Sequence, residues 1–439
     1  MEFIVIIIFI LGYLAITLEH SLKVDKLVPA LIMMAFCWTI ITVSHLQLFD
    51  VEEYHLVNFS QKHLKNFLVH HLGKTAEILI FLIGAMTIVE IIDYFNGFSY
   101  LKKIIKTKSK TKMLWIISIL AFFLSAIIDN LTATIVLITI LRKLVHTNNE
   151  RIWFASLIII SANAGGAWSP IGDVTTTMLW IAEKVTTKAL ILNLFIPSII
   201  CMVVPVFIAS RLKVFRGNLV GEAEEKYDNN YNSKYGSIML FLGLGMIVFV
   251  PVFKTLTHLP PYVGMMLSLA IVSIFGEIFS NRAFKLSDIK EGKRPHSPIH
   301  NALTKIEMTS ILFFLGILMA VAALETIGQL YYFSEWLNVT VPNENIVVLI
   351  LGVCSAIIDN VPLVAASISM FTDPIDSKLW HFIAYAAGTG GSMLIIGSAA
   401  GVVAMGMEKI KFFWYMLKVG WLAFLGYLLG AVVFLLFFN

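Results

Sequence analysis

With 439 residues, of which 58% are hydrophobic and only 14% charged, the chain is far more apolar than a soluble domain, in which about a quarter of the residues are charged. Mean hydropathy is +0.85, and apolar runs of the roughly 20 residues needed to cross a bilayer recur from end to end, which excludes a soluble fold. The formal net charge of +4 says little about partners, but the sequence has no nucleic-acid motif and no phosphate loop. The three cysteines lie in apolar runs without metal-ligand spacing, and no cofactor is expected.

Ten segments are predicted to cross the membrane fully, so we expect an all-α polytopic membrane protein. In chain order they lie at about 2–18, 27–44, 76–95, 152–182, 189–209, 236–255, 261–279, 305–324, 380–406 and 412–437. The first has no basic region and no small-residue cleavage site, so we interpret it as a span rather than a signal peptide. Two more apolar stretches, 113–141 and 346–371, are interrupted near the middle by Asp-Asn and do not fit a single crossing.

The charges that flank these two stretches indicate how each one enters the membrane. Residues 102–112, before the first stretch, are rich in lysine, and Arg142 and Lys143 follow the stretch. Both flanks should therefore be cytoplasmic, because cytoplasmic loops are rich in Lys and Arg. A segment that enters and leaves on one side is a re-entrant hairpin. The flanks of the second stretch are acidic, which predicts a second hairpin that enters from outside.

The remaining loops fit the same orientation. Residues 211–235 and the basic loop after 279 are predicted to be cytoplasmic, as are Lys23 and Lys26 between the first two spans. Residues 45–75 form a predicted outer loop with five histidines. These histidines favour a solvated amphipathic loop, and a metal-binding or pH-sensing cluster stays open as the alternative.

The two halves of the chain repeat one order of elements: three spans, a hairpin, a broken span and a last span. Five full crossings per half is an odd number, so the second half must insert upside down. The segment Ser-Ala-Ile-Ile-Asp-Asn occurs at 125–130 and again at 355–360. Inverted repeats with broken helices are the architecture of secondary transporters.

The predicted domains follow from this repeat. They are a first inverted repeat at 1–210 with its hairpin at 113–141 and its broken helix at 152–182, a cytoplasmic linker at 211–235, and a second inverted repeat at 236–439 with its hairpin at 346–371 and its broken helix at 380–406.

The first hairpin tip carries Asp129, Asn130 and Thr132. An ionised Asp at the bilayer centre costs about 3 kcal/mol, and no Lys or Arg lies within either hairpin to offset its charge. A bound cation or a proton could take that role. Carboxylate, amide, hydroxyl and carbonyl oxygens suit a hard ion such as Na⁺. The alternative, a helix cap formed by Asp129 and Asn130, is compatible with ion binding.

The broken span of the first half places a second carboxylate, Asp173, at membrane depth. The glycines of both broken spans, with Pro170 in the first, cannot sustain a continuous helix, and such backbone is tolerated where it lines a cavity. These helix-breaking glycines are Gly165, Gly166, Gly172, Gly390, Gly391 and Gly397. Thr175 and Thr176 follow Asp173 and open the next half-helix.

The second half carries less charge at the corresponding position. Ser398 stands where the first half has Asp173, although Asp359 and Asn360 remain at the second hairpin tip. We therefore expect an asymmetric ion site, with its negative charge weighted to the first half.

The paired Asp-Asn hairpins and the run Asn-Ala-Gly-Gly-Ala-Trp-Ser-Pro-Ile-Gly-Asp-Val-Thr-Thr at 163–176 resemble the NhaD-type Na⁺/H⁺ antiporters. These belong to the ion transporter superfamily, which also contains arsenite and dicarboxylate carriers. The resemblance covers most of the chain, from Glu19 to the last span. It implies exchange of Na⁺, and often Li⁺, for H⁺ in a bacterial or organellar inner membrane, by an elevator-like movement, commonly in a homodimer.

The functional positions implied by the resemblance are Asp129, Asn130, Thr132, Asn163, Asp173, Thr175, Thr176, Ser355 and Asn360. We expect Na⁺ at four of the candidate residues, namely Asp129, Asn130, Asp173 and Thr176. The lipid bilayer is the surrounding medium. The bacterial inner membrane is the expected location.

The expected mechanism is competition between Na⁺ and protons for the midmembrane carboxylates. The alternative function is a Na⁺-coupled carrier of a small anion, of the dicarboxylate or arsenite type. Asp173 and the absence of a cationic residue in the broken spans argue against that alternative. A membrane enzyme is disfavoured, since no His lies inside the motif regions to complete a nucleophile–base pair.

Overall fold

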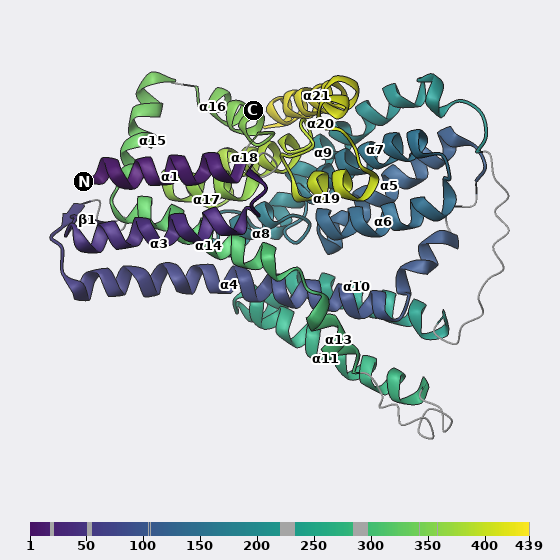
Figure 1. The fold of residues 1–439 in the computed structure, drawn as a ribbon, viewed down its shortest axis with the longest axis horizontal. Coiled ribbons are helices and arrows are strands. Elements are labelled where there is room, and N and C mark those ends of the chain that lie inside the picture. Colours follow the sequence, from purple (N-terminus) through teal and green to yellow (C-terminus); the bar gives the residue numbers. More distant parts are fainter. Residues whose placement is uncertain are drawn as a thin grey trace.

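The computed structural model describes residues 1–17, 22–50, 55–103, 105, 107–219, 233–283, 297–341, 343–357 and 359–438. These residues form an elongated bundle of helices (Figure 1). Seven of the described helices are long and apolar enough to cross a membrane. The predicted all-α polytopic membrane protein is thus confirmed, with one two-stranded antiparallel sheet added to it.

The elements up to residue 215 are α1 (Glu2–Thr17), α3 (Leu27–Val43), β1 (Leu48–Asp50), β2 (His55–Val57), α4 (Gln61–Tyr94), η1 (Gly97–Lys103), α5 (Lys110–Ile128), α6 (Asn130–Leu144), α7 (Asn148–Gly166), α8 (Val174–Ile181), α9 (Thr187–Ser210) and η2 (Lys213–Phe215). The later elements are α10 (Ser233–Thr257), α11 (Pro261–Ala283), α13 (Pro298–Lys305), α14 (Met308–Thr326), α15 (Gln329–Thr340), α16 (Glu344–Cys354), α17 (Asn360–Met370), α18 (Lys378–Gly390), α19 (Ala399–Glu408), α20 (Phe412–Tyr415), η3 (Met416–Gly420) and α21 (Trp421–Phe437).

Each predicted span corresponds to a helix or to a broken helix. The first two, α1 and α3, are shorter apolar helices of 16 and 17 residues. The third predicted span is wrong at its beginning, because α4 starts at Gln61 rather than near 76. Ser60 caps that end by accepting a 3.1 Å hydrogen bond from the backbone N–H of His63, and this satisfies an otherwise unpaired donor of the first turn.

Two predicted loops contain secondary structure. The outer loop 45–75 holds β1, β2 and the first turns of α4, and the flank 325–345 holds α15. Of the predicted linker 211–235, residues 220–232 lie outside the described part of the chain, as do Lys285, Lys290, Lys293 and Arg294 of the following basic loop.

The interruptions predicted at both Asp-Asn segments are confirmed. Helix α5 ends at Ile128 and α6 begins at Asn130, with Asp129 between them at a φ of 77°, and the two helices pack against each other. Helices α16 and α17 are separated by residues 355–359. In Figure 1 the α5–α6 pair lies toward the right of the bundle and the α16–α17 pair toward the left.

Each hairpin is fastened to the broken helix of its own half by an equivalent hydrogen bond. The Ser125 hydroxyl donates to the backbone oxygen of Ala162 over 2.6 Å. In the second half, the Ser355 hydroxyl donates to the backbone oxygen of Ala387 over 2.9 Å. The two serines hold the same position in the repeated segment. The repeated residues therefore make the same kind of hydrogen bond in both halves.

Two of the predicted helix-breaking glycines also permit backbone contact between hairpin and broken helix. A Cβ atom at Gly165 would lie 2.1 Å from the carbonyl oxygen of Phe122 on α5. A Cβ atom at Gly390 would lie 2.0 Å from the carbonyl oxygen of Gly352 on α16. Any larger residue would overlap these oxygens, so glycine is required where the helices touch.

Within each break, the backbone also approaches itself too closely for a side chain at the glycine. A Cβ atom at Gly166 would lie 2.5 Å from the oxygen of Gly172, and one at Gly391 would lie 2.6 Å from the oxygen of Gly397. The chain therefore turns back on itself between α7 and α8, and again between α18 and α19.

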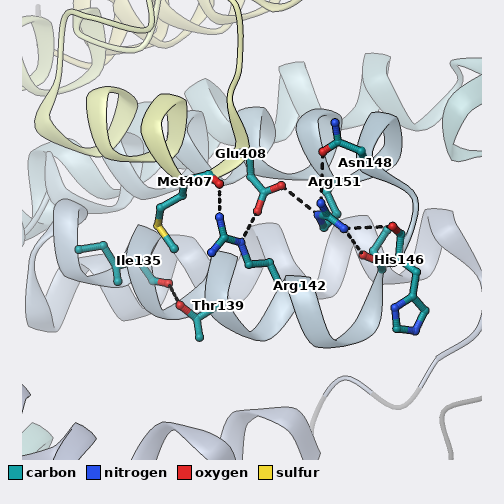
Figure 2. A network of polar contacts seen from close by, with 9 residues as sticks. Ile135, Thr139, Arg142, His146, Asn148, Arg151, Met407 and Glu408 are labelled. Carbon is teal, nitrogen blue, oxygen red and sulfur yellow. Dashed lines mark hydrogen bonds and ion pairs between the residues drawn. The ribbon is translucent and has the colours of Figure 1, made fainter.

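A buried ion-pair cluster joins the second half to the first (Figure 2). Glu408, at the end of α19, is 3% exposed. Its two carboxylate oxygens accept hydrogen bonds from Arg142 Nε over 2.7 Å and from Arg151 Nε over 2.9 Å. Arg142 also donates to the Met407 backbone oxygen. This cluster ties α19 to the end of the first hairpin and to the beginning of α7.

The corresponding position of the first half is joined differently. With Gly172 aligned to Gly397, Glu408 corresponds to Glu183, which is exposed. In the first half, the contact with the other half is made by Thr186, which binds Asp376 in the loop before α18. The Asp376 carboxylate accepts hydrogen bonds from the Thr186 backbone N–H and hydroxyl, at 2.7 and 2.8 Å. Both contacts join the two halves: Glu408 of α19 binds Arg142 of α6 and Arg151 of α7, and Asp376 binds Thr186, the N-cap residue of α9.

Candidate functional site

Asp173 lies at the centre of the candidate site, immediately before α8, and is 3% exposed. The Asn130 side-chain amide donates to its Oδ1 over 3.1 Å, and the Asn360 amide donates to its Oδ2 over 3.0 Å. The Thr175 hydroxyl donates to Oδ2 over 2.5 Å. Both hairpins therefore contribute a donor to one buried carboxylate, which is how a buried charge is stabilised.

Asn163 of α7 extends this network to the second broken helix. Its side-chain oxygen accepts a 3.0 Å hydrogen bond from Asn130, and its nitrogen donates to the Ser398 hydroxyl over 2.9 Å. Ser398 stands where the first half has Asp173. The network therefore crosses from one half to the other, and its carboxylate comes from the first, as the sequence predicts.

Asp129 has two roles in the structure. Its Oδ1 accepts a 2.8 Å hydrogen bond from the Thr132 backbone N–H, and its Oδ2 accepts one of 2.9 Å from the Thr132 hydroxyl, so it caps α6. With Asp173 and Thr177 it also lines a small cavity of about 20 Å³. A cavity of that size has room for one water-sized particle. Two carboxylates consequently border a space large enough for one small ion.

Two further predicted residues, Thr176 and Ser355, do not line the cavity. The Thr176 hydroxyl donates to the backbone oxygen of Asp173 over 2.9 Å. The Ser355 hydroxyl bonds to the Ala387 backbone oxygen instead. The structure thus brings Asp129, Asn130 and Asp173 together, and it places Ser355 at the contact between hairpin and broken helix.

Asp359 is paired with a residue that the sequence analysis assigned to a loop. Lys26 Nζ lies 3.1 Å from Asp359 Oδ2. Lys26 precedes the first residue of α3 and also lies 4.4 Å from the ring centre of Phe313 on α14. The sequence shows that Lys26 lies directly before an apolar span. No pattern in the neighbouring residues predicts its contact with Asp359.

A second, larger cavity opens beside α8. It has a volume of about 680 Å³ and is lined by the ends of α8, α14 and α17 and by residues of α4 and of the α10–α11 connection. Its charged side chains have both signs, and they include Lys74, Glu77, Lys184, Lys254 and Glu325. The sequence does not predict this cavity, because its lining comes from segments far apart in the chain.

Helix α8 contributes lining residues to both cavities. Val174 and Thr177 line the small cavity, whereas Met178 and Ile181 line the large one. Trp180 of α8 is buried, and Lys254 Nζ donates to its backbone oxygen over 3.0 Å. The N-terminal end of α8 therefore meets the carboxylates and its C-terminal end meets the larger cavity.

The histidines of residues 45–75 do not form a metal site within the described residues, where no group of three or more His, Cys, Asp or Glu side chains could hold a metal. His71 is 7% exposed, and its Nε2 lies 3.2 Å from the Thr326 hydroxyl. It is therefore a packed helix residue of α4.

Comparison with known proteins places the chain among transporters. The family model CitMHS, described as citrate transporter, matches residues 3–377. Sodium/proton antiporter 2 of Arabidopsis thaliana is 39% identical, over 99% of both chains. The Na⁺/H⁺ antiporter NhaD of Vibrio cholerae is 30% identical, over 98% of this chain and 91% of its own.

A solved structure shares the fold. The YdaH transporter of Alcanivorax borkumensis, whose crystal structure is described as having an unusual topology, superposes with a TM-score of 0.56 at 12% identity. The match covers 93% of this chain and 96% of that one. The likeness concerns the fold, and the family assignment comes from the sequence matches.

Proposed function

The chain belongs to the family of the citrate-transporter model and of the NhaD-type Na⁺/H⁺ antiporters, and on that premise we propose that it exchanges Na⁺ for H⁺ across the membrane. One observation carries the proposal. Asp173, held by amides from both hairpins, borders with Asp129 a cavity of about 20 Å³. The other lining residues, except Thr177, are apolar, so the two carboxylates are the charged groups available there to one small hard cation.

The proposed exchange uses one pair of carboxylates for both ions. Na⁺ and protons each neutralise Asp129 and Asp173, and a protonated acid no longer attracts Na⁺, so the two ions compete. Asn130 and Asn360 donate to Asp173 in this structure. Each amide also carries an oxygen, and turning the amide would offer that oxygen to Na⁺. Li⁺, another small hard cation, should compete for the same oxygens.

We propose that residues 1–210 and 236–439 are inverted repeats, and that the hairpins and broken helices of both move as one body. The equivalent bonds of Ser125 and Ser355 support the repeat. The cross-links at Glu408 and Asp376 support a single rigid unit. A homodimer in a bacterial inner membrane is proposed from the resemblance to NhaD-type antiporters.

The experiment that tests this function uses everted membrane vesicles with an acidified lumen and a pH-sensitive dye. Added Na⁺ should enter the lumen in exchange for protons, so the lumen becomes alkaline and dye fluorescence recovers. Li⁺ should act in the same way. An absence of response to Na⁺ and Li⁺ between about pH 7 and 9.5, together with uptake of citrate, succinate or arsenite, would instead establish the anion carrier.

The anion carrier remains the second candidate, because the matching family model is described as a citrate transporter. Lys184 and Lys254 line the larger cavity and could meet an anion there. Glu77 and Glu325 line the same cavity, however, and the carboxylates at the small cavity repel anions. The balance of charge therefore favours a cation.

A further inference from the structure

The two hairpin tips carry equivalent aspartates with different partners. Asp129 and Asp359 occupy the same position of the repeated segment, and each caps the helix that follows it. Asp129 Oδ1 accepts from Thr132 N over 2.8 Å, and Asp359 Oδ1 accepts from Val361 N over 3.3 Å. The other oxygen of Asp129 accepts from a neutral hydroxyl, whereas that of Asp359 lies 3.1 Å from the Lys26 ammonium.

Lys26 reaches the second tip from outside the hairpins. It precedes α3, which packs on α1 and α14. Both partners are largely removed from solvent, since the side chains of Lys26 and Asp359 are 21% and 13% exposed. Two charges that are withdrawn from water in this way stabilise each other, and each would be costly without the other. The ammonium thus supplies the positive charge that a bound cation would supply.

Among the described residues, no ammonium or guanidinium group pairs with the first tip. Within the part of the chain that the structure describes, the ion pairs found do not include Asp129 or Asp173. Those two carboxylates border the small cavity, and Asp359 does not line it. The two tips therefore differ in two ways: a positive charge lies beside the aspartate of the second, and the small cavity lies beside the aspartate of the first.

We propose that the Lys26 ammonium is a tethered cation that occupies the carboxylate of the second hairpin, so that the transporter binds Na⁺ only at Asp129 and Asp173. The inference rests on the proposed Na⁺/H⁺ exchange and specifies where that exchange binds its ion. It makes Lys26 a residue that determines how many Na⁺ ions the protein binds. Replacing the ammonium by an uncharged group should open a second Na⁺ site at Asp359.

The test is equilibrium binding of radioactive ²²Na⁺ to the purified full-length protein. The unsubstituted protein should bind one Na⁺ per chain. Lys26→Met, which keeps the length of the side chain and removes its charge, should bind two. Lys26→Arg keeps a cation beside Asp359 and should bind one. The double variant Lys26→Met/Asp359→Asn should return to one, because the second carboxylate is gone.

The outcomes separate this inference from the proposed function. If the unsubstituted protein binds no Na⁺, the proposed function fails. If it binds two, or if Lys26→Met binds one with an unchanged Na⁺ dependence, the tethered cation is refuted while the antiporter stands. Lys26→Met should also be stabilised against heat by Na⁺, relative to choline, more than the unsubstituted protein is. Should Lys26→Met not fold in either cation, Lys26→Gln is measured with the same two outcomes.

Discussion

The side-chain amide of Asn360 donates a 3.0 Å hydrogen bond to Oδ2 of Asp173, across 187 positions of sequence. Asn130 of the first hairpin donates to the other oxygen of the same carboxylate. One buried charge therefore holds together two hairpins from different halves of the chain. A change at this carboxylate should alter both ion binding and the contact between the halves.

Asp173→Asn should abolish Na⁺-driven proton exchange. The substitution keeps the size of the side chain but removes the negative charge that attracts Na⁺ and accepts the proton. We expect Na⁺-dependent dye recovery in everted vesicles to fall by at least about tenfold, equivalent to about 1.4 kcal/mol. Asp93→Asn, at an exposed position near the end of α4, is the control and should keep the response. Full exchange by Asp173→Asn would contradict the proposed site.

Asn360→Ala should weaken the response to Na⁺ without removing it. The variant loses a hydrogen bond to a buried carboxylate, and a bond to a charged group contributes about 1.5–3 kcal/mol. The Na⁺ concentration for half-maximal exchange should rise by roughly tenfold or more. Asn345→Ala, in the first turn of the same hairpin, serves as the control. An unchanged half-maximal concentration would show that the Asn360 amide plays no part in ion binding.

Glu408→Ala should destabilise the protein, because it leaves Arg142 and Arg151 without their buried carboxylate. Loss of one partner from a buried ion pair costs up to roughly 3–5 kcal/mol, and less here, since Arg142 is 45% exposed. The melting temperature in detergent should therefore fall. Glu183→Ala, at the corresponding exposed position of the first half, should leave it nearly unchanged. Equal melting temperatures for the two variants would rule out the cluster as a stabilising joint.

Gly165→Ala and Gly390→Ala should each impair folding. The added methyl would lie 2.1 or 2.0 Å from a backbone oxygen, so the helices would have to separate, at a cost of about 1–3 kcal/mol or more. Gly406→Ala is the matched control, since a Cβ there meets nothing within 4 Å. The amount of folded protein after size-exclusion chromatography measures the effect. Normal yields for both variants would show that these helices are not in close contact.

Features that depend on local chemistry can be predicted from the residues of one segment. Residues that disrupt helices, such as Gly172 and Gly397, located the breaks, and the Asp-Asn pairs located the hairpin tips. Apolar length located the spans, because a bilayer demands it of each helix independently. The extent of α4 was missed because its polar first turns carry no hydrophobic signal.

The pairing of charges, by contrast, becomes known only from the folded chain. Lys26 and Asp359 are separated by 333 positions, and Arg142 and Glu408 by 266, so no local pattern relates them. The sequence placed Asp129 and Asp359 in equivalent positions, and folding made them different by bringing an ammonium to one and a small cavity to the other. Ion pairs and cavities depend on the distances between helices. Helix breaks and membrane spans depend only on the residues within a single helix.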